Sequence, residues 1–176
     1  MRLGLSLAGG GIKGAAHIGA LKAFEEEDIK FEYVSGTSSG SIVATLFASG
    51  YAADEIYNIF KKYMNKIHYI DFKNIKKFFV NLFTGKGIVI DGLNSGEKIS
   101  TLINEVCKKK NILNIKDVKI PLIIPAVNIV TEELYVFSNC KFKNKTKHVK
   151  YINNINIGNA VQASCSYPRS IFAMLL

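Results

Sequence analysis

The sequence contains no tryptophan and is poor in proline and cysteine, with three of each in 176 residues. Cys107, Cys140 and Cys165 are an odd number without paired spacing, which argues against a disulfide framework or zinc knuckle and fits a reducing compartment. We find neither an internal repeat nor a linker rich in proline or glycine. Since a domain has about 100–200 residues, we expect residues 1–176 to form a single domain.

Acidic residues are scarce in the later part of the chain. Residues 1–60 carry four basic and seven acidic side chains, residues 61–176 carry 19 and seven, and the formal net charge is +9. This excess indicates an anionic partner, or a solvated lysine-rich surface. Only two of the 23 basic residues are arginine, the preferred reader of base edges. We therefore expect no nucleic-acid partner, while peripheral contact with an anionic membrane surface and a merely solvated lysine-rich surface stay open as alternatives.

No targeting or membrane-spanning segment is recognisable. Residues 3–8 are too short for the apolar part of a signal peptide and continue directly into glycines. Residues 33–53 are uncharged, but their glycines and serines predict a strand, a tight turn and a buried helix. The expected location is cytoplasmic or peripheral at the membrane, with secretion by a route without an N-terminal signal peptide as an alternative.

Hydrophobic periodicity predicts alternating strands and helices. Strands are expected at residues 3–8, 31–35, 122–128 and 133–138, and helices at residues 15–27, 39–49, 54–65, 93–109 and 157–166. Gly50 is expected to end the second helix, and Asp54 to be the N-cap of the third. From Val136 onward we expect a lysine-rich hairpin arm. Alternation with short connections is typical of an α/β fold whose mainly parallel central sheet is covered on both faces.

A glycine turn, Gly9-Gly10-Gly11-Ile12-Lys13-Gly14, stands between the first predicted strand and helix. Glycines let the backbone fold tightly and expose its N–H groups, and the following helix N-terminus adds positive potential. Such a turn stabilises an anion, either a phosphate or the oxyanion of acyl transfer. The spacing of Gly9, Gly11 and Gly14 also satisfies the dinucleotide-binding pattern.

A second motif, Gly36-Thr37-Ser38-Ser39-Gly40, matches a nucleophile elbow. An elbow needs glycines on either side of the serine, because side chains there would collide with neighbouring backbone. The context fits, since a strand-like segment precedes the motif and a helix-like segment follows it.

The elbow also weighs against nucleotide binding. A dinucleotide fold places an acid at the end of its second strand, but Glu32 stands at the start of that strand. The match to a phosphate-binding P-loop is also poor, because Gly14 is followed by two alanines in place of lysine and serine.

Three blocks of the chain carry a family resemblance. They are Leu3–Gly19 (LGLSLAGGGIKGAAHIG), Tyr33–Gly50 (YVSGTSSGSIVATLFASG) and Ala160–Phe172 (AVQASCSYPRSIF). In this order they resemble the patatin-like phospholipase family over almost the whole chain. The resemblance implies a three-layer α/β/α fold and hydrolysis of carboxylic esters in phospholipids or lysophospholipids by a Ser–Asp dyad, without a cofactor or metal.

Carried over by position, the resemblance makes Ser38 the nucleophile and the turn its oxyanion hole. The elbow residues are Gly36, Thr37, Ser39 and Gly40, and the oxyanion-hole residues are Gly9, Gly10, Gly11, Ile12 and Gly14, chiefly through the N–H groups of Gly10, Gly11 and Ile12.

The dyad aspartate has no obvious counterpart. The family's aspartate lies in a D-G-G or D-G-A turn shortly after the third block, and the sequence ends at Leu176 before such a turn. The Asp91-Gly92 pair precedes a predicted helix and does not match the dyad position. We therefore expect the base and some C-terminal elements to lie beyond Leu176. Two alternatives stay open: a non-catalytic lipid-binding relic of the same fold, and a nucleotide-binding domain that uses the glycine turn.

Several other residues have competing interpretations. Residues 67–83 mix aromatics with lysines, and form either an interfacial amphipathic segment or a core-packed helix. Lys141, Lys143, Lys145 and Lys147 alternate, so in a strand they share one face, which we interpret as a charge-protected edge strand in preference to a lipid-binding row. His17 and Cys165 are interpreted as packed or hydrogen-bonded side chains.

Overall fold

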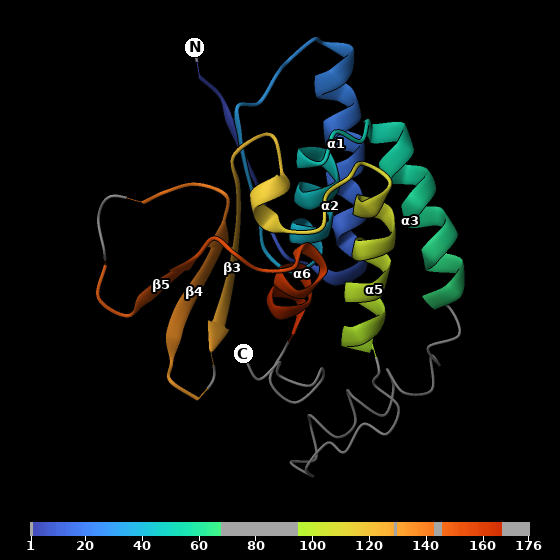
Figure 1. The fold of residues 1–176 in the computed structure, drawn as a ribbon. Coiled ribbons are helices and arrows are strands. Elements are labelled where there is room, and N and C mark those ends of the chain that lie inside the picture. The colour runs from blue at the N-terminus through green and yellow to red at the C-terminus, as the bar shows by residue number, and fades with distance from the viewer. Residues whose placement is uncertain (1, 68–94, 129, 143–145, 167–176) are drawn as a thin grey trace, which may run out of the picture.

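The computed structural model describes residues 2–67, 95–128, 130–142 and 146–166 (Figure 1). The expectations for Asp91, Lys143, Lys145 and the aromatic segment that follows residue 67 lie outside these residues.

Five strands form one sheet in the order β1-β2-β3-β4-β5. β1 pairs with β2 and β2 with β3 in parallel, β3 pairs with β4 antiparallel, and β4 pairs with β5 in parallel. The predicted α/β fold with a mainly parallel sheet is therefore confirmed. The strands are β1 (Gly4–Leu7), β2 (Tyr33–Gly36), β3 (Leu122–Asn128), β4 (Glu133–Ser138) and β5 (Val149–Ile152).

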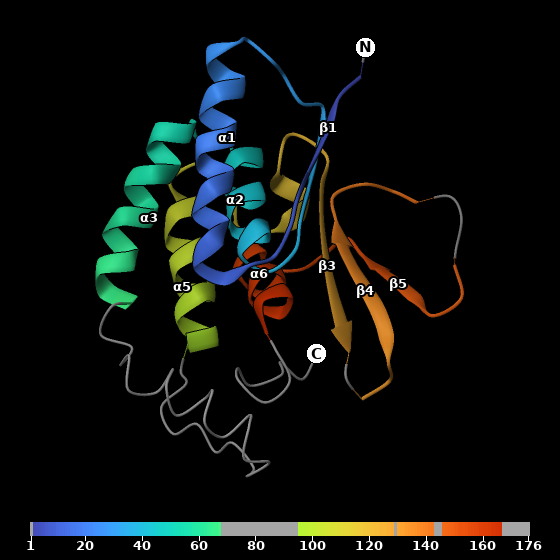
Figure 2. The ribbon, with the colours of Figure 1, turned by 180° about the vertical axis from the view of Figure 1, so that it is seen from behind.

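The helices of the described residues lie on one side of the sheet (Figures 1 and 2). Because β1, β2 and β3 are adjacent in chain order, right-handed crossovers place their connecting helices on the same face. Helical cover on the second face stays a prediction. The helices are η1 (Gly11–Gly14), α1 (Ala15–Glu26), α2 (Ser39–Ala48), α3 (Ala53–Ile67), α5 (Ser95–Lys108), η2 (Ile115–Asp117) and α6 (Ile157–Cys165).

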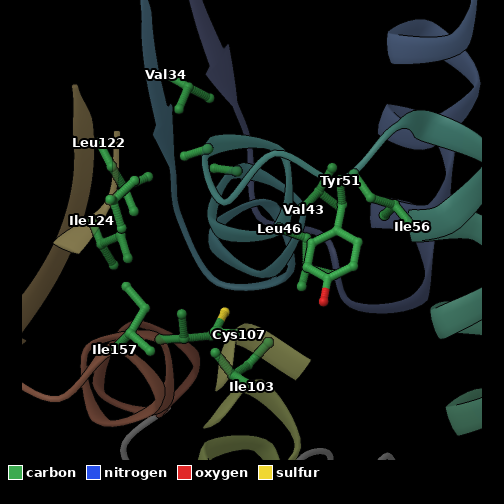
Figure 3. Packing of buried hydrophobic residues seen from close by; sticks show 14 of the residues in the cluster. Val34, Val43, Leu46, Tyr51, Ile56, Ile103, Cys107, Leu122, Ile124 and Ile157 are labelled. Carbon is green, nitrogen blue, oxygen red and sulfur yellow. The ribbon is translucent and has the colours of Figure 1, made fainter. Parts of the chain in front are cut away.

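The core surrounds α2, which lies between the sheet and the outer helices (Figure 3). Val43 and Leu46 of α2 are fully buried, and Val34, Leu122 and Ile124 face them from the sheet. Full burial of each such aliphatic side chain stabilises the fold by about 1.5–3 kcal/mol. This packing holds α2, and with it the β2–α2 turn, in a fixed position.

The uncharged stretch 33–53 contains β2 and α2, as expected, and none of the helices in the described part of the chain is long and apolar enough to cross a membrane. Gly50 follows α2 with φ +83°, a left-handed conformation that glycine adopts without strain, so its predicted role in ending the helix is confirmed.

Asp54 is not the N-cap of α3, contrary to expectation. The helix begins at Ala53, whose N–H donates to the Glu25 carboxylate at 3.0 Å, while the N–H of Ala52 donates to Glu55 at 2.9 Å. Asp54 forms an exposed ion pair with Lys22 at 2.7 Å. The N–H of Ala53, the first residue of α3, is thus satisfied by a residue 28 positions earlier, which local sequence does not reveal.

The hairpin arm predicted from Val136 onward is also wrong. β5 pairs with β4 in parallel, with Leu134 opposite Val149, so the chain crosses back before β5 begins. Lys141 and Lys147 precede β5 and belong to no strand, so these two do not form the expected one-sided row. A ten-residue connection is long enough to return the chain to the end of the sheet at which β4 begins, and lysine alternation alone does not indicate pairing direction.

Candidate active site

Ser38 lies between the end of β2 and the start of α2. Its backbone has φ 51° and ψ −126°, which a non-glycine residue adopts only under strain. The strain is held by the buried helix that follows and by the hydrogen bond from the Thr37 N–H to the Leu7 carbonyl at 3.0 Å. A serine in a strained strand-to-helix turn is the geometry of a nucleophile elbow.

Two elbow glycines stand where no side chain fits. A Cβ on Gly36 would overlap the carbonyl oxygen of Gly40, and a Cβ on Gly40 would overlap the carbonyl oxygen of Leu7. These obstacles are backbone atoms, which cannot rotate away. The sequence pattern and the observed packing therefore have the same cause, a turn so tight that backbone contacts backbone.

The glycine turn contacts the serine directly. A Cβ on Gly9 would lie 3.1 Å from the Cβ and 3.9 Å from the Oγ of Ser38, and a Cβ on Gly14 would lie 2.6 Å from the Oγ of Ser39. His17 helps to hold the turn, since its Nε2 is 2.8 Å from the Ala8 carbonyl oxygen. The absence of side chains at Gly9 and Gly14 thus brings the two motifs into contact.

The turn leaves N–H groups available. Gly10 precedes η1, and Gly11 and Ile12 open it, so these three N–H groups have no acceptor within a helix. Residues 9–13 are exposed, and Ile12 is 68% exposed. These N–H groups make no hydrogen bond to the described residues, and beside a strained serine they can stabilise negative charge that develops on a substrate oxygen.

The end of α6 completes the surroundings of the elbow (Figure 2). The N–H of Ser38 donates to the Oγ of Ser164 at 3.0 Å, and the Oγ of Ser41 donates to the Ser38 carbonyl at 2.6 Å. Ser164 was not singled out from the sequence, although it lies in the third block of the resemblance. The Ser164 hydroxyl thus accepts a hydrogen bond from the Ser38 N–H, which the positive φ of Ser38 turns away from α2.

A thiol also lies next to the elbow. The Cys165 Sγ is 4.0 Å from the Ser41 Oγ, and burial raises the pKa of this thiol to about 11, with the hydroxyls of Ser41 and Ser38 opposing the shift. A neutral thiol is a weak nucleophile, so this environment does not activate Cys165. The expectation that Cys165 is a packed side chain agrees with this environment.

The three described aspartates are engaged away from the elbow. Asp28 pairs with Lys30 at 3.0 Å, Asp54 pairs with Lys22, and Asp117 accepts from the N–H groups of Leu113 and Asn114 at 3.1 and 2.8 Å. The described residues also contain no group of three His, Cys, Asp or Glu that could hold a metal ion. None of these contacts of the described aspartates involves Ser38.

Comparison with known proteins agrees on one family. The family model described as Patatin-like phospholipase matches residues 5–169. Lysophospholipase NTE1 of Yarrowia lipolytica is 42% identical over 65 residues, which are 37% of this chain and 5% of that protein. Uncharacterized protein YqhO of Bacillus subtilis is 44% identical over 55 residues, 31% of this chain and 19% of that protein. The chain thus spans a small fraction of the curated relatives it matches.

A solved structure shares the fold. The heterodimeric ExoU–SpcU complex from the type III secretion system of Pseudomonas aeruginosa matches 99% of this chain and 38% of the compared chain. The TM-score is 0.61 and the sequence identity is 22%, so the likeness concerns the fold alone.

Proposed function

The chain belongs to the patatin-like phospholipase family, and from this premise we propose that it hydrolyses carboxylic esters of phospholipids or lysophospholipids with Ser38 as the nucleophile. One observation carries the proposal: a strained serine at a strand-to-helix turn lies against a glycine turn with free N–H groups. The family match and the lysophospholipase among the relatives support the reaction class.

The proposed reaction proceeds in two steps. The Ser38 Oγ attacks the ester carbonyl while an aspartate takes its proton, and the N–H groups of Gly10, Gly11 and Ile12 stabilise the oxyanion. The alcohol leaves with a proton and the acyl group stays on Ser38. Water then hydrolyses this acyl-enzyme and releases a fatty acid. The excess of lysines favours approach to an anionic membrane surface.

Labelling with a fluorophosphonate tests the nucleophile. The probe should modify the chain, and Ser38→Ala should abolish the modification. Ser35→Ala is the matched control, because Ser35 lies three residues earlier in β2 and its Oγ donates to the Ser6 Oγ of β1 at 3.0 Å. Labelling that survives Ser38→Ala would refute the assignment, and lipid binding without any labelling would favour a non-catalytic relic.

The base needs a separate experiment, because we propose that it is an aspartate outside the described residues. Hydrolysis of a soluble ester would be compared between residues 1–176, the same chain with Asp91→Asn, and a chain extended through the next in-frame aspartate. Loss of a base lowers the rate on the order of 10⁴-fold. A gain of this size in the extended chain supports a base beyond Leu176, whereas a loss confined to Asp91→Asn assigns the base to Asp91.

A further inference from the structure

A cavity of about 620 Å³ opens at the end of the sheet opposite Ser38. Its walls come from the connection before β2, the C-terminal end of α2 and the segments between α5 and β3. Ser38 stands at the other end of α2, and ten helical residues separate the two places by roughly 15 Å. The cavity is therefore distinct from the candidate active site, and its volume is in the range of about 300–1,000 Å³ typical of small-molecule sites.

The cavity has a preformed apolar lining, contributed by Ile29, Phe31, Phe47, Ala48, Ile112 and Ile120. Phe31 packs edge to face on Phe47 with ring centroids 6.4 Å apart, and on Phe24 at 5.1 Å. Ala48 and Ile112 are almost fully buried. An alkyl chain would find contacts here, whereas water would find few hydrogen-bond partners.

The rim of the cavity favours an anion. Lys119 forms no ion pair with the described residues, and Lys110 lies over the Tyr51 ring at 4.5 Å and 3.8 Å from Glu55. Lys30 pairs at 3.0 Å with Asp28, but both side chains are more than 80% exposed, so the pair is weak. The other acid at the rim, Glu25, accepts the N–H of Ala53.

We propose that this cavity binds a fatty carboxylate, with its alkyl chain on Phe31 and Phe47 and its carboxylate at Lys119. An apolar lining next to Lys119, which forms no ion pair with the described residues, matches a ligand with one chain and one negative charge. The site goes beyond the proposed hydrolysis and does not depend on it, because Ser38 takes no part in the binding.

Calorimetric titration of the Ser38→Ala chain with laurate, below its micelle concentration, tests the proposal. We expect saturable binding of one laurate per chain. Each methylene added between octanoate and laurate should tighten binding about fourfold, since each buries apolar surface. Dodecyltrimethylammonium, which has the same chain and a positive charge, should bind at least tenfold more weakly. Equal binding of the two amphiphiles would overturn the proposal.

Paired variants locate the site. Lys119→Glu should weaken laurate binding about tenfold, while Lys147→Glu, an equal charge change before β5, should alter it less than twofold. Ile29→Asp should also weaken binding, whereas Val130→Asp, which alters an exposed side chain between β3 and β4, should not. Circular dichroism confirms that each variant is folded. Laurate binding unchanged by both cavity variants would refute the site, and failure of Ser38 labelling would concern the proposed hydrolysis alone.

Discussion

The two ends of α2 are built in opposite ways. At its N-terminal end, backbone packs on backbone, glycines remove every obstructing Cβ, and Ser38 is held at a positive φ. At its C-terminal end, side chains stand apart and leave a cavity lined by Phe47 and Ala48. The contrast shows that one buried helix is packed tightly at one end and loosely at the other. Close contact suits the proposed nucleophile, which must be held in one orientation, whereas a gap between side chains suits the proposed ligand site.

The same comparison extends to two thiols, of which Cys107 is buried and Cys165 partly buried. Cys165 lies beside Ser41 at the N-terminal end of α2, with its Sγ 4.0 Å from the Ser41 Oγ. Cys107 lies beside Ser49 at the C-terminal end, at 3.6 Å. Burial raises the pKa of each thiol to about 11, so the two ends differ in packing but share a low polarity.

The largest expected effect comes from adding a methyl group at the tight end. Gly36→Ala should lower the free energy of unfolding by at least about 3 kcal/mol, because the new Cβ would overlap the Gly40 carbonyl. Urea unfolding measures the change. Gly19→Ala is the matched control: Gly19 lies in α1 with open space around it, and alanine there should stabilise the fold by about 0.5–1 kcal/mol. Similar changes in both variants would contradict the tight-turn explanation.

Alkaline pH should weaken both ends of α2. Unfolded thiols ionise near pH 9 whereas Cys107 and Cys165, whose pKa is about 11, stay neutral, so the free energy of unfolding should fall as pH rises from 9 to 11. The loss is roughly 2–3 kcal/mol per thiol. Urea unfolding between pH 8 and pH 11 measures it.

Cysteine variants separate this loss from the titration of other groups. Cys107→Ala should remove part of the pH dependence, while Cys140→Ala, at a half-buried position outside the core, should leave it in place. An identical slope in the parent chain and in Cys107→Ala would argue against burial of this thiol.

Ser164→Ala should affect the elbow more than the rest of the fold. Loss of its Oγ leaves the Ser38 N–H without an acceptor, which should cost about 1–2 kcal/mol in the free energy of unfolding and slow fluorophosphonate labelling. Ser166→Ala removes a hydroxyl that donates to the Gln162 carbonyl and should change both quantities less. A larger effect of Ser166→Ala would show that the Ser38 contact is unimportant.

The smallest expected effect concerns Glu25, at the rim of the cavity. Glu25→Ala removes the carboxylate that accepts the Ala53 N–H at the start of α3, and should lower the free energy of unfolding by about 1 kcal/mol. Glu26→Ala, one residue later and exposed, should have a negligible effect on thermal unfolding. Equal effects of the two variants would show that the capping contact contributes little.

Much of the fold could be predicted from local pattern. Strands and helices were placed correctly around both glycine motifs, because glycine spacing and apolar periodicity act within a few residues. The direction of β5, the cap of α3 and the Ser38–Ser164 bond could not be predicted. They depend on residues far apart in the chain, such as the 126 positions between Ser38 and Ser164.

The sequence by itself determined that a strand, a tight turn and a helix occur twice in succession, since only glycine tolerates the backbone contacts at Gly36 and Gly40. The tertiary structure alone decided that Gly9 lies against Ser38 and that the Ser164 Oγ accepts a hydrogen bond from the Ser38 N–H. It also decided that the other end of α2 borders a cavity. These contacts arise when sheet pairing and core packing bring distant segments together, and no local pattern encodes such an approach.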